Sequence, residues 1–600
     1  MSQKIINTDD LAFLLYEMLD IERFTQFPRY EDHSRDTFDA AIELALKVAS
    51  ETFAPHNRLC DEDEPRFENG KVVIRPEVSE ALAVLRDTGL MAASQDYERG
   101  GMQLPAAVSQ TCIGLIKGAN VSTQAYAGLT IAACNLIMAH GTDEQKQRYA
   151  EPMMAGRFFG TMCLTEPHAG SSLGDIKSRA IPQDDGTYRI SGNKIFISAG
   201  DHELSENIIH MVLARLPGAP AGVKGISLFL VPKVLVNEDG SLGERNDVAL
   251  AGLIHKMGYR GTTSTMLNLG EAAGAVGYLV GAPHEGLAAM FHMMNEARIG
   301  VGLGSVMLGY TGYLHALEYA LERQQGRPVG EKDPESPQVP LIRHADIRRM
   351  LLAQKAYVEG GLALCLQGAV LVDEKKFAET GEQRELAAGL LDLLTPVIKS
   401  WPSRYCLEAN SLAIQVHGGY GYTREYPVEQ FYRDNRLNPI HEGTHGIQGI
   451  DLLGRKVSMA DGRYYRELVR RIEATIAEAR KQERLASNAG LLERSLSAMV
   501  EATRVINEVK ASGDKEKALA NATLYLDAFG QVVVGWLWVR QALKALVGLG
   551  GAGEQTEGFY QGKLRACDYF CRYELPGVVA TAELLQSVDS TALDMFDEAF

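Results

Sequence analysis

The feature that most restricts the fold is a change of sequence pattern, from helical to strand-like and back again. From Thr37 to about residue 156 apolar residues recur three and four positions apart, as in AAIELALKVASETFAP, which is the spacing of one helix face. From there to about residue 283 short β-rich runs such as ISLFLVP alternate with turn residues, as in an antiparallel sheet or a small barrel. Long helical stretches return at His284. We therefore expect a mainly helical protein with a central β domain.

These changes divide the 600 residues into five expected segments. A typical domain has roughly 100–200 residues, which allows roughly three to five structural units. One helix is expected to end at His140, and the next to begin with a capping box from Thr142 to Gln145. The expected segments are an N-terminal extension (1–36), an N-terminal helical domain (37–158), a middle β domain (159–283), a C-terminal helical bundle (284–456) and an additional helical domain (457–600).

Charge and composition exclude some classes of partner. The net charge of −17 argues against broad nucleic-acid binding, which needs a basic surface to replace counterions. The eight cysteines are scattered without a C-x-x-C pair, so we expect reduced, mostly buried thiols. The N-terminus lacks the basic and apolar stretches of a signal peptide, and no apolar run approaches the roughly 20 residues of a membrane span. We expect a cytoplasmic protein with no integral membrane segment and no metal site.

Two motifs in the β region have the donors that a flavin requires. TMCLTEPHAGS supplies Thr165 and adjacent main chain, and a flavin ring needs such donors at its pyrimidine edge to stabilise negative charge on reduction. Ser171, just past the Ala-Gly turn, can reach a phosphate. SGNKIFISAG places Phe196 and Ser198 on one face of a strand. Taken alone, the motifs also fit an ordinary Pro/Gly turn and a packed strand with an exposed serine.

Four further motifs lie in the helical region after residue 284. MNEAR ends at Arg298, and RQQ begins at Arg323, whose planar guanidinium suits a phosphate. QVHGGYGY begins at Gln415, has glycines that permit close backbone approach, and is followed by TREYPVEQFYRD. IHEGTHGIQ contains Glu442. Taken alone, Arg298 also fits a surface ion pair, and Glu442 a helix cap.

Together and in this order, the motifs resemble those of the acyl-CoA dehydrogenase family over roughly residues 37–456. The family pattern is Thr-Glu-Pro-x-Ala-Gly-Ser at the first motif and aromatic-Glu-Gly-Thr-x-x-Ile-Gln at the last. The chain is most similar in style to the long bacterial members, which include fatty acyl-CoA dehydrogenases and 3-methylmercaptopropionyl-CoA dehydrogenases. It departs from the common pattern at Phe196, where Trp is frequent, at His441, where Tyr is frequent, and at His445, where Asn or Ser is common.

The resemblance implies FAD as cofactor and a role for each matching residue. Glu442 is implied as the base that removes the α-proton, with a pKa raised by burial. The implied FAD contacts are Met162, Leu164, Thr165, Ser171, Phe196, Ser198, Arg323, Gln325, Gln415, Gly418, Gly419 and Thr444, with Arg323 reaching the FAD of a neighbouring subunit. The implied substrate contacts are Ser171, Asn295, Arg298, His441 and Gly443, the last giving room beside the carboxylate.

The implied reaction is α,β-dehydrogenation of a medium- or long-chain fatty acyl-CoA to the trans-2-enoyl-CoA, the first oxidative step of β-oxidation. Electrons are expected to pass to an electron-transfer flavoprotein, and the protein is expected to be a homodimer. One alternative is an acyl-CoA oxidase that uses O2. Another is a non-enzymatic flavin- or DNA-binding member of the fold with a basic C-terminal domain. Residues 458–600 contain 17 Lys and Arg against 20 Asp and Glu, which argues against that last alternative.

Overall fold

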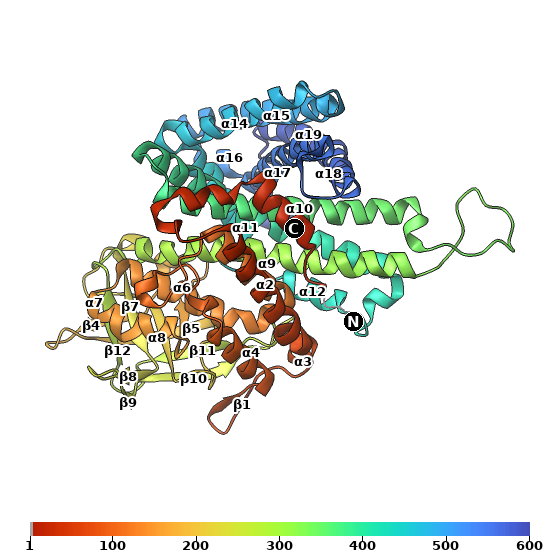
Figure 1. Ribbon diagram of the computed structural model, residues 1–600. Coiled ribbons are helices and arrows are strands. Elements are labelled where there is room, and N and C mark those ends of the chain that lie inside the picture. Colours follow the sequence, from red (N-terminus) through yellow and green to blue (C-terminus); the bar gives the residue numbers. More distant parts are fainter. Residues whose placement is uncertain (1–3) are drawn as a thin grey trace. The chain divides into compact units, whose positions relative to one another are not determined.

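The computed structural model describes residues 4–600, with the side chains of residues 292 and 294–296 outside the description. Two compact units make up the chain. Unit 1 is Asp36–Ala297, and unit 2 combines Lys4–Arg35 with Arg298–Phe600. The expected mainly helical fold with a central β domain is confirmed (Figure 1). Residues Lys4–Arg35 therefore belong with the C-terminal unit, which sequence reasoning did not foresee.

Helices precede the strands in unit 1. Its longer helices are α2 (Arg35–Val48), α4 (Pro76–Asp87), α5 (Ala106–Ala119) and α6 (Val121–His140), and the shorter ones are α3 (Asn57–Glu62), α7 (Asp143–Gln145) and α8 (Glu151–Met154). The helix end at His140 is confirmed, and so is the capping box: Thr142 Oγ1 accepts the Gln145 amide while the Gln145 side chain accepts the Thr142 amide. This exchange satisfies two amides that the first turn of a helix leaves unpaired.

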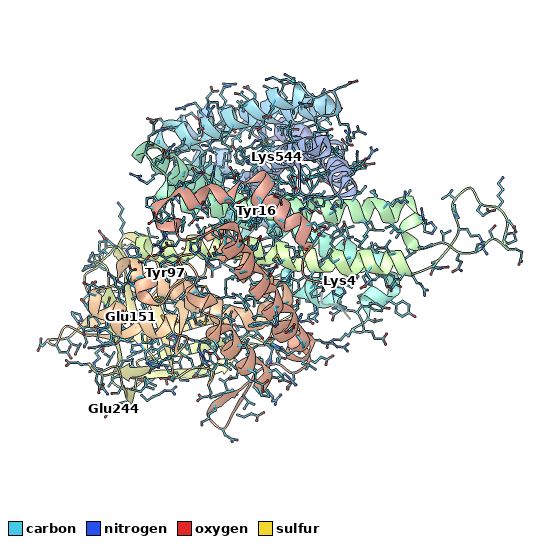
Figure 2. The ribbon with its side chains drawn as sticks, viewed as in Figure 1. Lys4, Tyr16, Tyr97, Glu151, Glu244 and Lys544 are labelled. Carbon is cyan, nitrogen blue, oxygen red and sulfur yellow. The ribbon has the colours of Figure 1, made fainter. Side chains whose placement is uncertain are left out.

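The main sheet of unit 1 has eight strands, seven of them in the order β10-β11-β5-β12-β7-β6-β3, with β4 pairing beside β5 and β6. Their bounds are β3 (Phe158–Cys163), β4 (Arg179–Pro182), β5 (Tyr188–Ser198), β6 (Asn207–Arg215), β7 (Ile226–Pro232), β10 (Val248–Leu253), β11 (Ser264–Leu269) and β12 (Ala275–Val280). Two separate hairpins are β1 (Arg66–Glu68) with β2 (Lys71–Val73), and β8 (Val234–Val236) with β9 (Leu242–Arg245), where Glu244 lies on the surface (Figure 2).

The sheet is largely antiparallel, as expected, but β6 pairs in parallel with both β3 and β4. Parallel neighbours need a long connection, and β4 and β5 lie in the connection between β3 and β6. Both faces of the sheet are buried, as the alternation along β6 shows. Met211 and Leu213 join one core cluster that includes residues of α6, whereas Val212 and Ala214 join a second cluster with β5, β10 and β11.

Three long helices form the bundle of unit 2: α9 (Gly286–Glu322, from Arg298 onward), α10 (Ala345–Phe377) and α11 (Gly381–His417). Pro402 lies inside α11 and has no amide to bond the carbonyl of Ile398. Gly302 of α9 packs on that carbonyl, since a Cβ at this position would lie 2.0 Å from Ile398 O. The glycine therefore permits α9 and α11 to approach closely where the proline interrupts the helix.

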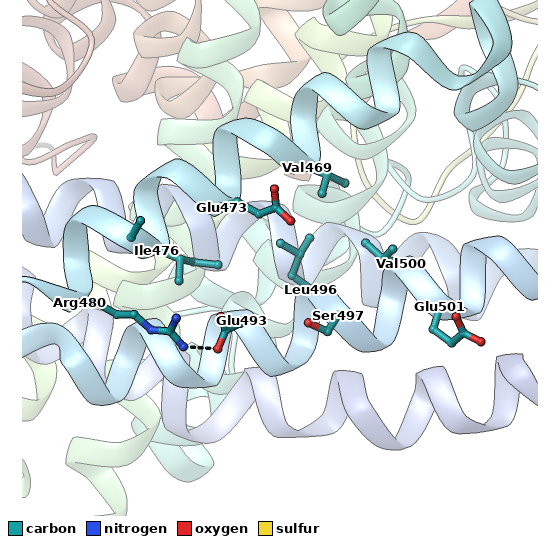
Figure 3. Close-up of a pocket in the computed structure, with 10 residues that line it drawn as sticks. Val469, Glu473, Ile476, Arg480, Glu493, Leu496, Ser497, Val500 and Glu501 are labelled. Carbon is teal, nitrogen blue, oxygen red and sulfur yellow. Dashed lines mark hydrogen bonds and ion pairs between the residues drawn. The ribbon is translucent and has the colours of Figure 1, made fainter.

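The remaining helices of unit 2 follow the bundle or precede it. They are α1 (Thr8–Ala12), α12 (Val428–Asn435), α13 (His445–Gly454), α14 (Arg463–Arg480), α15 (Ala486–Ala511), α16 (Lys515–Leu519), α17 (Ala522–Val547), α18 (Glu557–Tyr569), α19 (Leu575–Gln586) and α20 (Thr591–Asp594). All eight cysteines of the chain are buried thiols. A groove of about 320 Å³ between α14 and α15 is lined by apolar and acidic side chains, with an ion pair between Arg480 and Glu493 (Figure 3).

Two helices are long and apolar enough to cross a membrane by length and composition: α10 and residues Ala522–Ala552. The most apolar stretches of these two helices are 89% and 67% buried inside the protein, respectively. A core helix of a large protein has the same composition, so these helices are weak evidence for a membrane span.

Candidate active site

Glu442 lies in a short loop, residues 436–444, between α12 and α13 of unit 2. Glu442 and Gly443 both have left-handed backbone conformations, with φ of 56° and 91°. For a residue with a side chain this conformation costs about 1–2 kcal/mol, so the surroundings of the loop must hold Glu442 in place. The φ of position 443 favours glycine, and a Cβ there would lie 2.6 Å from Gln448 Nε2 and displace the end of that side chain.

Two side chains from neighbouring helices hold the carbonyl groups of this loop. Lys399 Nζ of α11 donates to Gly443 O at 2.8 Å, and Gln448 Nε2 of α13 donates to Glu442 O at 3.2 Å. Thr444 is the N-cap of α13, and its hydroxyl accepts the Ile447 amide at 3.3 Å. Thr444, predicted as an FAD contact, therefore has a structural role as well.

A chain of buried amide side chains anchors the start of the same loop. Asn435 Nδ2 donates to Asn410 Oδ1 of α11 at 2.7 Å, and Asn438 Nδ2 donates to Asn435 Oδ1 at 2.9 Å. Asn438 Oδ1 lies 3.0 Å from His441 Nε2. His441, predicted as a substrate contact, is thus oriented from within the protein. Sequence reasoning missed these asparagines, although Asn435 and Asn438 lie in the segment RDNRLNP just before Glu442.

The electrostatic surroundings of Glu442 suit a proton acceptor. Burial raises the pKa of the Glu442 carboxyl, while the positive charges of Arg298 and Lys399 act in the opposite direction. Arg298 is itself buried, which lowers its pKa, and the charges of Asp451 and Glu442 oppose that shift. The structure therefore brings two of the predicted residues, Glu442 and Arg298, into one electrostatic neighbourhood. A carboxyl with a raised pKa is a better base near neutral pH.

In unit 1, a buried ion pair joins the two motifs predicted to bind flavin. The Glu166 carboxylate accepts the amides of Lys177 and Ser178 at 2.7 and 3.1 Å. It also pairs with Lys194 Nζ at 2.9 Å, and Lys194 donates to Leu164 O at 3.1 Å. Glu166 and Ala169 exchange backbone hydrogen bonds across a tight turn. The TMCLTEPHAGS motif is thereby fixed against β5, the strand that contains most of the SGNKIFISAG motif.

The predicted flavin contacts of unit 1 lie on open surface or are half-buried. Phe196 occupies a β-bulge where β5 pairs with β11, has φ of 58°, and is 62% exposed. Ser198 lies beside it and is exposed, as predicted from the alternation of the strand. Ser171 is also exposed, and the half-buried members are Met162, Leu164 and Thr165.

In unit 2, the structure brings Arg323 together with the glycine-rich motif. The Arg323 guanidinium lies 6.0 Å from the centre of the Tyr420 ring, and its Nη2 donates to Gln325 Oε1 at 3.3 Å. The nearby predicted contacts Gln415, Gly418 and Gly419 are exposed. A Cβ at either glycine would meet no atom of this chain within 4 Å, which leaves room for a ligand to approach. The side chain of Asn295 lies outside the described residues.

The fold and these residues define a helical oxidoreductase with a central β domain, and comparison with known proteins identifies its family. The acyl-CoA dehydrogenase N-terminal, middle and C-terminal domain models match residues 36–157, 161–271 and 284–457, and the acetyl-CoA dehydrogenase C-terminal-like model matches 468–596. The 3-methylmercaptopropionyl-CoA dehydrogenase of Ruegeria pomeroyi is 38% identical, over 93% of this chain and 95% of its own. The broad-specificity linear acyl-CoA dehydrogenase of Mycobacterium tuberculosis is 33% identical over 100% of both chains.

The chain therefore belongs to the acyl-CoA dehydrogenase family. It is an oxidoreductase, and FAD is the cofactor of the family. A crystal structure of an acyl-CoA dehydrogenase with FAD from Bacillus anthracis has the same fold, with a TM-score of 0.75 and 19% identity, covering 95% of this chain and 90% of that one. The fold similarity extends through the additional helical domain that follows the bundle.

Proposed function

We propose that this enzyme oxidises the Cα–Cβ bond of a linear fatty acyl-CoA of medium to long chain, with Glu442 as the base. The observation that carries the proposal is the Glu442 loop itself. It combines a buried carboxyl with a raised pKa, a strained backbone held by two side-chain donors, and a neighbouring Gly443 that leaves space beside the carboxylate. Strain of this kind persists where the surrounding structure fixes it, often at a catalytic group.

The residues of the chain have distinct proposed roles toward substrate and cofactor. Bound FAD supplies the two-electron acceptor for the reaction. Thr165, Ser198 and the main chain beside them would hold the flavin, with the ring of Phe196 covering it. Arg323 and the Gly418–Gly419 backbone would bind its phosphates, across a subunit boundary as the family resemblance implies. Glu442 would take the α-proton of the thioester, while Arg298, His441 and Gly443 line the substrate side.

The wider setting of the enzyme is also proposed. Electrons would pass from the reduced cofactor to an electron-transfer flavoprotein, and the trans-2-enoyl-CoA would continue through β-oxidation in the cytoplasm. The five segments expected from the sequence would be its domains, with residues 457–600 packed on the helical bundle of the same chain. The assembly would be a homodimer. Support for an acyl-CoA substrate comes from relatives named as butyryl-CoA, 3-methylmercaptopropionyl-CoA and linear acyl-CoA dehydrogenases, whereas the medium to long chain rests on the family resemblance.

The test is the Glu442→Gln variant, whose amide preserves shape but accepts no proton. It should retain FAD and bind octanoyl-CoA, yet lose about 10²–10⁴-fold in turnover with an artificial electron acceptor under anaerobic conditions. The exposed Glu473 of α14 gives the matched control, and Glu473→Gln should leave turnover unchanged. Activity of the Glu442 variant within tenfold of the wild type would show that another group is the base.

A further inference from the structure

Lys399 is fully buried within α11, at a position where a lysine is costly to place. Its Nζ donates a hydrogen bond to the carbonyl oxygen of Gly443, the residue after the proposed base, at 2.8 Å. Removing this amine would leave the Gly443 carbonyl oxygen without its donor, which costs stability. The charge of the amine also acts on Glu442, which indicates a role in the function of the loop.

Three ionisable groups act on Lys399 or are affected by it. Glu442 comes from the loop, Arg298 from α9 and His445 from the start of α13. The pKa of Lys399 is lowered to about 7, mainly by burial; the charge of Glu442 opposes the shift and that of Arg298 adds to it. Burial also lowers the pKa of His445 to about 4, with Arg404 and Lys399 adding to the effect, so His445 is neutral at pH 7.

We propose that Lys399 is a positioning residue for the base: it holds the Gly443 carbonyl and, when protonated, stabilises the Glu442 carboxylate. The inference rests on the proposed function of Glu442 and adds a second ionisable group to the same site. By holding the Gly443 carbonyl, Lys399 keeps Glu442 and Gly443, the two residues with left-handed backbone, in place before α13. The positive charge favours the ionised form of Glu442, the form that accepts a proton.

The proposal determines how activity depends on pH. Proton abstraction requires the Glu442 carboxylate, so the rate rises with pH through the pKa of Glu442. A protonated Lys399 lowers that pKa, and loss of its proton near pH 7 raises it again. Because the two groups titrate together, the rising limb of the wild-type profile should be broader than a single-proton curve. Removing the charge of Lys399 should move the limb to higher pH by about 1 unit.

The experiment is a stopped-flow measurement of flavin reduction by saturating octanoyl-CoA between pH 5 and pH 9. Lys399→Met should move the rising limb to higher pH and lower its maximum by about 10²-fold, since the carbonyl is released. Lys399→Arg keeps a positive charge at every pH. The rising limb of its pH profile should therefore narrow to a single-proton curve without moving to higher pH. Lys510 of α15 also binds backbone carbonyls, those of Leu453 and Gly454, and gives the matched control Lys510→Met, whose profile should match wild type.

The outcomes separate this inference from the proposed function. If Lys399→Met reduces flavin with an unshifted limb, Lys399 has only a structural role, even where Glu442→Gln is inactive. If Lys399→Met fails to fold, the Lys399→Arg variant alone tests the proposal. A rising limb of its pH profile as broad as that of the wild type then overturns the proposal. An active Glu442→Gln would instead remove the proposed base, whatever the Lys399 variants do.

Discussion

Lys563 is expected to be among the most sensitive positions for stability, because it neutralises two buried carboxylates. Its amine pairs with Asp10 of the N-terminal segment, with Glu359 Oε2 of α10 at 2.8 Å, and with Gln541 Oε1 of α17 at 3.0 Å. All of these side chains are fully buried. Lys355 forms a second ion pair with Glu359, so the cluster of two lysines and two carboxylates is neutral.

Replacing Lys563 with Met keeps the apolar stem but leaves one negative charge in the cluster without a partner. Loss of one partner from a buried ion pair costs about 3–5 kcal/mol. The amine also lies 5.1–5.5 Å from the ring centres of Phe13, Trp538 and Phe559, which adds up to about 2 kcal/mol. We expect Lys563→Met to lower the free energy of unfolding by about 4 kcal/mol, a large part of a typical ~5–15 kcal/mol.

Urea unfolding of the FAD-loaded protein, followed by circular dichroism at pH 8 and pH 5, measures the change. Burial and Glu359 already raise the pKa of Asp10, and loss of Lys563 raises it further. A carboxyl whose pKa is raised by folding destabilises the protein above its unfolded pKa, and the penalty disappears as pH falls through the folded pKa. The destabilisation should therefore be smaller at pH 5 than at pH 8.

Two variants test the reasoning on Lys563. Lys544→Met, at an exposed position of α17, is the control and should change stability by less than about 0.5 kcal/mol. Adding Asp10→Asn to Lys563→Met restores a neutral cluster and should recover part of the lost stability. The reasoning is refuted if Lys563→Met unfolds within about 1 kcal/mol of wild type at pH 8, or if Asp10→Asn makes the double variant less stable still.

Three further predictions concern the cofactor, the added domain and the assembly. Arg323→Ala should lower the amount of FAD retained after gel filtration, measured by flavin absorbance, because it removes the guanidinium beside Tyr420. Unchanged retention would contradict the assignment of Arg323 as an FAD contact. Asp527→Ala of α17 removes the carboxylate that lies 2.9 Å from His445 Nε2. This variant should reduce flavin about tenfold more slowly with little change in KM. A change in KM alone would contradict this prediction. Light scattering should give the mass of two chains, and a stable mass of four would show that residues 457–600 permit tetramers.

The order of helical and β regions could be predicted from the sequence because each depends on local patterns. The capping box at Thr142 is an example, since all of its donors and acceptors lie within four residues. The parallel pairing of β3 with β6 depends on contacts between strands over 40 residues apart, and no local pattern specifies it. For the same reason the N-terminal segment was expected as an extension, although Asp10 is a fully buried part of unit 2.

The candidate site divides in a similar way. Glu442 and Gly443 could be predicted because the reacting group and its required glycine are adjacent in the sequence. Lys399 could not, because it reads as an ordinary lysine in a long helix, and only the packing of α11 shows it to be buried. The asparagines at 410, 435 and 438 are likewise unremarkable singly and become a hydrogen-bonded chain only when α11 and α12 meet.

The pairing of Asp10 with Lys563 also affects the order in which the chain can fold during synthesis. Residues 36–297 form a unit of their own and can complete it as soon as they leave the ribosome. Asp10 emerges before them, yet its partner is made 553 residues later. At about 5–20 residues per second, Asp10 therefore waits roughly half a minute to two minutes before Lys563 is made. Asp10 is thus synthesised before unit 1, yet it reaches its final pairing only after α18.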